Sequence, residues 1–179
     1  MIALWNEMEA RGGRGKVFQG GSMGAIVTSE QYRQRTSRYR VNMSMPQNDT
    51  LHLAQEFLRR LGAGAEAGET AKLFSENLEW EIAGDIGVLP WIGQKSGRAA
   101  ITDFINDSRA MIERISFGVH DVLASDDRAV ILGSLASRVK RTGKTINTDF
   151  AIVLTVANGE IIRFQMLEDS FAVSQAAHG

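Results

Sequence analysis

The chain has 179 residues, of which 44% are hydrophobic and 23% charged, and its formal net charge is −1. This composition is that of an ordinary globular protein with one sizeable core, and no apolar run is long enough to span a membrane. The absence of cysteine excludes disulfides, thiol nucleophiles and thiolate metal sites, and it fits the cytoplasm, where we expect the protein to be.

Residues 1–45 are predicted to be a basic, disordered segment. The first 42 residues hold seven Lys/Arg and three Asp/Glu, a net +4, which leaves about −5 on the remainder if the whole is −1. They show neither helical nor alternating apolar periodicity. We interpret them as sequence upstream of a start at Met43 or Met45. A basic arm that contacts nucleic acid is the weaker alternative, and we do not expect nucleic acid as a partner.

Three helices are predicted at the start of the folded domain, which we place at 46–174. Pro46 and the polar run 48–50 precede apolar residues at helical spacing, and glycines at 62 and 64 end this first helix. A shorter helix is predicted at about 66–74. The third opens near 96–97 and carries an apolar stripe at i, i+3, i+4 and i+7 that continues to Ile115.

Strands follow the helices. Leu78, Trp80 and Ile82 alternate with glutamates, and further apolar runs lie near 116–124, 129–141, 146–157 and 160–170. The turns at 125–127, 142–144 and 157–159 are short, so the strands that they join should be antiparallel neighbours. Helices first and a meander of strands last predict an α+β fold, with three helices packed on one face of a curved, mostly antiparallel sheet that encloses a cavity.

Residue alternation predicts which side chains face inward. On the last strand, the inward set runs from Ile162 through Met166 to Glu168. Pairing across the turn at 142–144 places Leu135 opposite Phe150. The inner surface is therefore mostly apolar. Its few polar members would be Glu168, Ser137, Thr148, the indole N–H of Trp80, and Asp121 if Phe117, Val119 and Leu123 point inward.

Several short segments carry a resemblance to a known family. They are Phe-Ser-Glu-Asn-Leu-Glu-Trp at 74–80, Pro-Trp-Ile-Gly at 90–93, Ser-Gly-Arg at 96–98, Asp-Phe-Ala-Ile-Val at 149–153, Ala-Asn-Gly-Glu-Ile at 157–161, and the run 164–169. Over about 50–173 the chain resembles the SnoaL-like polyketide cyclase and ketosteroid isomerase group of the nuclear-transport-factor-2-like superfamily. The resemblance implies a cone-shaped fold, a deep pocket closed by helices, and a homodimer joined through the outer sheet faces.

The positions that are usually catalytic in this superfamily hold apolar residues here. The isomerases of this group use a tyrosine, a general-base carboxylate and a protonated aspartic acid. By the resemblance, the corresponding positions in this chain hold Phe57, Ile82 and Ile152. The last-strand carboxylate of the epoxide-hydrolase relatives corresponds to Met166. Both tyrosines of the sequence fall within residues 1–45. Whether the protein is an enzyme therefore stays open.

Three hypotheses on function remain. The first is an isomerase, cyclase or lyase in which Glu168 or Asp121, its pKa raised by apolar surroundings, moves a proton on an apolar ring compound. The alternative is that Glu168 lies in water at the end of its strand and takes no part in catalysis. The second is a non-catalytic binder of an apolar metabolite, whose wall residues could also be an ordinary packed core. The third is an interaction module that dimerises through its outer sheet face.

The candidate ligand-binding residues are the same for the first two hypotheses. No cofactor is expected, because the glycine-flanked turn at 84–87 lacks the lysine and helix start of a phosphate loop. No metal site is expected, because the three histidines are scattered. The predicted wall of the cavity comprises Phe57, Trp80, Ile82, Trp91, Phe104, Leu135, Ser137, Phe150, Ile152, Phe164 and Met166.

Overall fold

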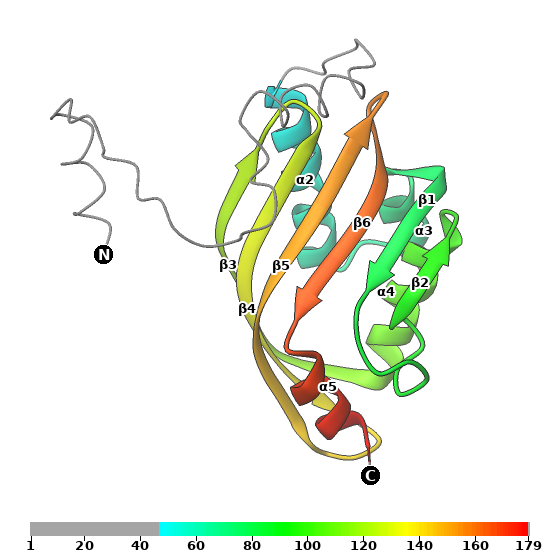
Figure 1. The fold of residues 1–179 in the computed structure, drawn as a ribbon, viewed down its shortest axis with the longest axis vertical. Coiled ribbons are helices and arrows are strands. Elements are labelled where there is room, and N and C mark those ends of the chain that lie inside the picture. Colours follow the sequence, from blue (N-terminus) through cyan, green and yellow to red (C-terminus); the bar gives the residue numbers. More distant parts are fainter. Residues whose placement is uncertain (1–46, 179) are drawn as a thin grey trace, which may run out of the picture. The chain divides into compact units, whose positions relative to one another are not determined.

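The computed structural model describes residues 47–178, so the predictions made for residues 1–45 lie outside the described part (Figure 1). None of the described helices is long and apolar enough to cross a membrane. Within this range the helices are α2 (Gln47–Gly62), α3 (Ala67–Ala71), α4 (Ala99–Met111) and α5 (Ser170–Ala177), and the strands are β1 (Phe74–Ile82), β2 (Gly93–Ser96), β3 (Ile112–Ala124), β4 (Arg128–Val139), β5 (Thr145–Ala157) and β6 (Glu160–Glu168).

The strands form one sheet in the order β2-β1-β6-β5-β4-β3. Neighbours are antiparallel except for β1 and β6, which run parallel. Figure 1 shows α2, α3 and α4 behind the sheet and α5 at one end of it. The predicted α+β class, with helices on one face of a mostly antiparallel sheet, is confirmed. Helix α5 and the short β2 are absent from the sequence-based prediction.

The ends of two helices differ from their predicted positions. Helix α2 begins at Gln47, ahead of the polar run expected to cap it. Thr50 lies inside the first turn, where its Oγ1 donates to the Asp126 carbonyl at 2.8 Å and ties the helix to the β3–β4 turn. Helix α4 ends at Met111, and only the end of the predicted stripe, Ile112 and Ile115, belongs to β3, because β-branched isoleucines fit a strand at least as well as a helix.

Bulges change which residues face inward on two strands. On β3, Val119 pairs with Gly133 but Asp121 pairs with Leu132, which leaves His120 as an extra residue. After this bulge Val122 faces the core, so Asp121 and Leu123 point outward, contrary to the sequence-based expectation. On β6 the extra residue is Ile162, because Val156 pairs with Ile161 and Thr155 with Arg163. Ile161 is buried in its place.

The hairpin between β5 and β6 forms as predicted. Asn158 and Gly159 both adopt positive φ, 53° and 78°, as a two-residue turn of type I′ requires. The register between β4 and β5 differs by two residues from the prediction, since Phe150 lies opposite Gly133 and Leu135 opposite Thr148. An even offset preserves the alternation, so Gly133, Leu135 and Ser137 still face inward.

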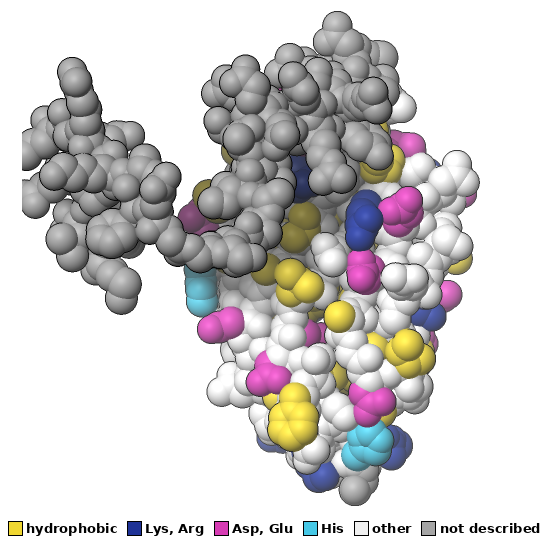
Figure 2. Space-filling view, viewed as in Figure 1, with side chains coloured by type: hydrophobic (Ala, Val, Ile, Leu, Met, Phe, Trp, Pro, Cys, Tyr) yellow, Lys and Arg dark blue, Asp and Glu magenta, His cyan; other side chains and the backbone are white. Residues whose placement is uncertain are grey.

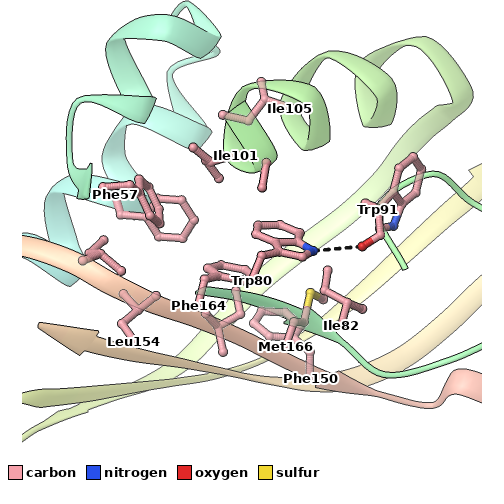
Figure 3. Close-up of a cluster of buried hydrophobic side chains, with 14 of the residues drawn as sticks. Phe57, Trp80, Ile82, Trp91, Ile101, Ile105, Phe150, Leu154, Phe164 and Met166 are labelled. Atoms are coloured by element: carbon pink, nitrogen blue, oxygen red, sulfur yellow. Dashed lines mark hydrogen bonds between the residues drawn. The ribbon is translucent and has the colours of Figure 1, made fainter. Parts of the chain in front are cut away.

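An aromatic cluster joins the helices to the sheet (Figure 3). The Trp80 ring stacks on Phe164, with centroids 4.4 Å apart and planes 6° from parallel, and Phe104 of α4 packs against it at 5.1 Å. Phe57 of α2 meets Phe164 edge-on at 6.1 Å. The Trp80 Nε1 donates to the Trp91 carbonyl at 2.9 Å, so the one polar atom of the buried indole is satisfied.

Gly133 allows the Phe150 ring and the Gly118 carbonyl oxygen to lie close to the β4 backbone. A Cβ atom at this position would lie 2.2 Å from the Gly118 carbonyl oxygen and 2.4 Å from Cζ of Phe150. The Phe150 ring therefore lies directly over the β4 backbone, where it stacks on Phe117 with centroids 4.9 Å apart.

Gly133→Ala should lower the free energy of unfolding by ~1–3 kcal/mol, because the added methyl group must displace the Phe150 ring or the β3 backbone. Chemical denaturation measures the loss. Gly118→Ala is the matched control on the neighbouring strand, since its Cβ would meet nothing closer than 3.8 Å. Equal stability of the two variants would contradict this account of the packing.

Candidate functional site

A cavity of about 590 Å³ lies between the inner face of the sheet and the helices. Its volume is in the range typical of small-molecule sites. Side chains from α2, α4, α5 and strands β3 to β6 line it. The predicted site residues that the structure brings together on its wall are Phe57, Trp91, Phe104, Leu135, Ser137, Ile152, Phe164, Met166 and Glu168.

Four predicted site residues lie away from the cavity wall. Trp80 and Ile82 are fully buried on β1, where Trp80 packs behind Phe164. Phe150 is buried beneath Phe117, which takes its place on the wall. Asp121 is exposed on the outer face because of the bulge before it, and its carboxylate accepts a hydrogen bond from the Val122 amide at 2.8 Å.

Sequence reasoning missed several wall residues. Two of them, Arg114 and Val173, show why. Arg114 pairs with Ser137 on the inner face, but it lies before the predicted start of its strand and next to a bulge. Val173 belongs to α5, whose start has a recognisable signal: Asp169 accepts hydrogen bonds from the amides of residues 171 and 172. The other missed wall residues are Leu58, Leu61, Gly62, Gly64, Leu89, Ile105, Ser108, Arg109, Ile112, Ser116, Phe117, Val119 and Ile146.

Helix α5 is held firmly over one end of the cavity. Its last carbonyl groups accept hydrogen bonds from the β4–β5 turn, where Thr142 Oγ1 donates to Ala176 at 2.7 Å and Lys144 Nζ donates to His178 at 2.9 Å. A cation at this end also complements the helix dipole. On the other side, Ser174 Oγ donates to Asp85 at 2.7 Å. These contacts hold Val173 in the wall.

Glu168 is the acidic side chain of the wall. It is half-buried at the end of β6, opposite Phe150. Within residues 47–178, no group donates a hydrogen bond to its carboxylate. Burial raises the pKa of Glu168 from an ordinary 4.5 to about 7, and the negative charge of neighbouring Asp169 adds to the effect. Near neutral pH the carboxyl group is therefore present in both its acidic and its basic form.

The basic and hydroxyl side chains of the wall come from α4, β3 and β4. They are Ser108, Arg109, Arg114, Ser116 and Ser137. Among the described residues, no three histidine, aspartate or glutamate side chains come together as a possible metal site. The wall thus combines an apolar surface with one carboxyl group and a small set of hydrogen-bond donors.

Comparison with known proteins identifies the fold. Residues 54–164 match the SnoaL-like domain family. An NTF2-like protein from Burkholderia xenovorans is 23% identical, with a TM-score of 0.67 over 75% of this chain and 99% of its own. A candidate isomerase from Rhodopseudomonas palustris is 22% identical, with a TM-score of 0.61 over 70% and 96% of the two chains.

A third solved structure, a candidate SnoaL-like polyketide cyclase from Mesorhizobium loti, is 19% identical, with a TM-score of 0.55 over 65% of this chain and 96% of its own. No curated protein matches the sequence. At these identities the solved structures establish a shared fold, and the chemistry has to be inferred from the side chains of this chain.

Replacing Glu168 should change how stability depends on pH. Between pH 4.5 and 7 the unfolded chain releases the Glu168 proton while the folded chain keeps it, so the wild type loses stability as the pH rises. Glu168→Gln cannot titrate. Its free energy of unfolding relative to the wild type should therefore increase from pH 4.5 to 7 and level off above pH 7.

Urea denaturation at a series of pH values measures this difference. Glu66→Gln is the control, because the Glu66 side chain is exposed and its carboxylate makes no hydrogen bond within the described residues. A difference between Glu168→Gln and the wild type that does not vary with pH would show that the Glu168 carboxyl group titrates as it does in water.

Proposed function

The chain belongs to the SnoaL-like domain family, and from this premise we propose that it is an acid–base enzyme of the isomerase or cyclase type acting on an apolar ring compound. The observation that carries the proposal is Glu168, a half-buried carboxyl group on a cavity wall that no described residue hydrogen-bonds. Proteins that share the fold include candidate isomerases and a candidate cyclase, which supports this class of reaction.

The proposed chemistry is a proton transfer at carbon. Ionised Glu168 removes a proton from a carbon next to a ring carbonyl, and the C–H electron pair moves into the enolate. The protonated carboxyl group then returns the proton to a different carbon, which isomerises the compound. In a cyclase, the enolate carbon instead attacks a second carbonyl group and the proton passes to the new alkoxide. A pKa near 7 suits both roles of Glu168.

Deuterium incorporation from D2O tests the proton transfer. Cyclic ketones of two to four fused rings should gain deuterium next to the carbonyl group in the presence of the wild type, as mass spectrometry measures. Glu168→Gln should lose this activity by a factor of ~10²–10⁴. The rate should rise with pH up to about 7 and then level off, because the ionised form of Glu168 is the base. Glu66→Gln should behave as the wild type.

Binding measured on the same compounds separates an enzyme from a binder. Ile152→Trp should fill the cavity and abolish the thermal stabilisation by ligand, with little loss of stability of its own, whereas Asn147→Trp, exposed on the opposite face of β5, should retain the response. If the wild type binds ring compounds but incorporates no deuterium, the non-catalytic binder replaces the enzyme. If no compound binds and Ile152→Trp unfolds the chain, the wall residues are an ordinary packed core. Both the enzyme and the non-catalytic binder are then contradicted.

We also propose that the outer sheet face joins two copies of the chain. Leu132, Ala151 and Leu167 form a row across β4, β5 and β6, and the outward-facing Leu123, Leu132 and Leu167 are 54%, 37% and 47% exposed. No described helix covers this face. Figure 2 shows its hydrophobic side chains interspersed with both basic and acidic ones, a mixture that can complement itself in a symmetric dimer.

Sedimentation equilibrium tests the dimer. The wild type should sediment at twice the chain mass of 19.6 kDa at micromolar concentration. Leu132→Glu should give the monomer, because it buries an unpaired charge at the centre of the interface. Asn147→Glu, at the end of the same face, is the control and should remain dimeric. A monomeric wild type would contradict the proposal.

A further inference from the structure

Two short segments of the chain are rich in basic residues, and Arg109 and Arg114 of the first line the cavity. The segments 109–114 and 138–144 contain Arg109, Arg114, Arg138, Lys140, Arg141 and Lys144 but only one acidic residue, Glu113. Five of these six basic side chains donate hydrogen bonds within the protein. Arg138 pairs with Glu113 at 3.0 Å, and the other four bond to backbone carbonyl groups, Arg109 to Ala65, Lys140 to Arg109, Arg141 to Ala177, and Lys144 to Gln175 and His178.

Arg114 is the exception among the six. Its guanidinium group donates to no residue in the described part of the chain, and its one described contact is with the Phe117 ring, whose centroid lies 5.6 Å from Cζ. The neighbouring carboxylate of Glu113 is already taken by Arg138. Because Arg114 both lines the cavity and is exposed, it lies at the cavity's opening.

The residue paired with Arg114 on the neighbouring strand carries a hydroxyl group. Ser137 is the cross-strand partner of Arg114, and both line the cavity. The Ser137 hydroxyl makes no hydrogen bond to any described residue. A guanidinium group and a hydroxyl donor on paired residues of one cavity wall can bind the two oxygens of a carboxylate, and the Phe117 ring beside the guanidinium offers an apolar surface.

We propose that Arg114 and Ser137 bind a carboxylate of the ligand, which makes the ligand an apolar ring compound with a carboxylate at one end. This inference rests on the proposed function, because it places a second group of the same ligand. Gly133 lies across the sheet from Phe150 and Glu168, and Ser137, four positions further along β4, lies across from Arg114, an offset of about 13 Å along the strands. The two groups are also three strands apart, because Glu168 is on β6 and Arg114 on β3. The ligand's ring system extends from Arg114 over Phe117 toward Glu168, and its reacting carbon lies at the end away from the carboxylate.

Matched pairs of acids and amides test the assignment by calorimetry. The probes are benzoate, 2-naphthoate and biphenyl-4-carboxylate, each with its amide, which keeps the shape and removes the charge. For at least one ring system the wild type should bind the acid about tenfold more tightly than the amide, the effect of a charge-assisted pair. Added salt should narrow this ratio.

The variants locate the anion site. Arg114→Gln should bring the affinity for the acid down to that for the amide and leave the amide's affinity unchanged, and Ser137→Ala should weaken acid binding a few-fold. Arg138→Gln is the matched control, because this arginine is adjacent in sequence to Ser137 but lies on the outer face. It should keep the wild-type preference.

The outcomes separate this inference from the proposed function. If acid and amide bind equally, or if Arg114→Gln keeps the preference for the acid, the assignment of a carboxylate site to Arg114 and Ser137 is wrong. Binding of the probes would still support a ligand cavity. If none of the six probes binds, the inference is overturned. Deuterium incorporation into neutral ketones then decides the proposed function independently, since that assay needs Glu168 and not Arg114.

Discussion

The packing of the Trp80 indole is the interaction on which the rest of the structure depends. Its ring lies between Phe164 of β6 and Phe104 of α4, so it sets the distance between the sheet and that helix. Its N–H bonds to the Trp91 carbonyl, which fixes the loop before β2. A buried donor left without a partner would cost about 1–3 kcal/mol, so this hydrogen bond allows a large, polar-tipped ring to occupy the centre of the core.

The cavity follows from the contrast between this cluster and the opposite side of the sheet. Large aromatic rings hold the helices away from β1 and β6, whereas the inward positions of β4 include the small Gly133 and Ser137. The Phe150 ring covers Gly133, and beyond it the described side chains leave the cavity of about 590 Å³. Phe117 and Val119 line the cavity and remain 37% and 40% exposed. Covering such apolar surface stabilises a protein by about 25 cal/mol per Å², so an apolar ligand has a ready source of binding free energy here.

The alternation of residues along the strands was enough to predict most of the sheet's inner face. Where the prediction failed on the sheet, a bulge had shifted the alternation. The positions of Ile152, Phe164 and Met166 on the wall follow from a period of two. The bulge at Ile162 does not change this, because it lies on β6 before Phe164 and Met166. The bulge at His120 reverses the orientation of Asp121, and no residue type in that stretch indicates it. Helix α5 was predictable in principle, since aspartate and serine before a short apolar run form a capping signal.

The separation of Glu168 from Arg114 has a consequence for acid–base chemistry in the cavity. A guanidinium group next to the carboxyl group would stabilise the carboxylate and lower its pKa, which would remove the protonated form from the neutral range. Instead, Glu168 has an apolar neighbour in Phe150 and a negatively charged one in Asp169, and both burial and charge favour its protonated form. A ligand anion held at Arg114 would be neutralised where it binds, so its charge would add little to that of Asp169. The two ends of the cavity can therefore act independently, one holding an anionic group and the other exchanging a proton with the ring.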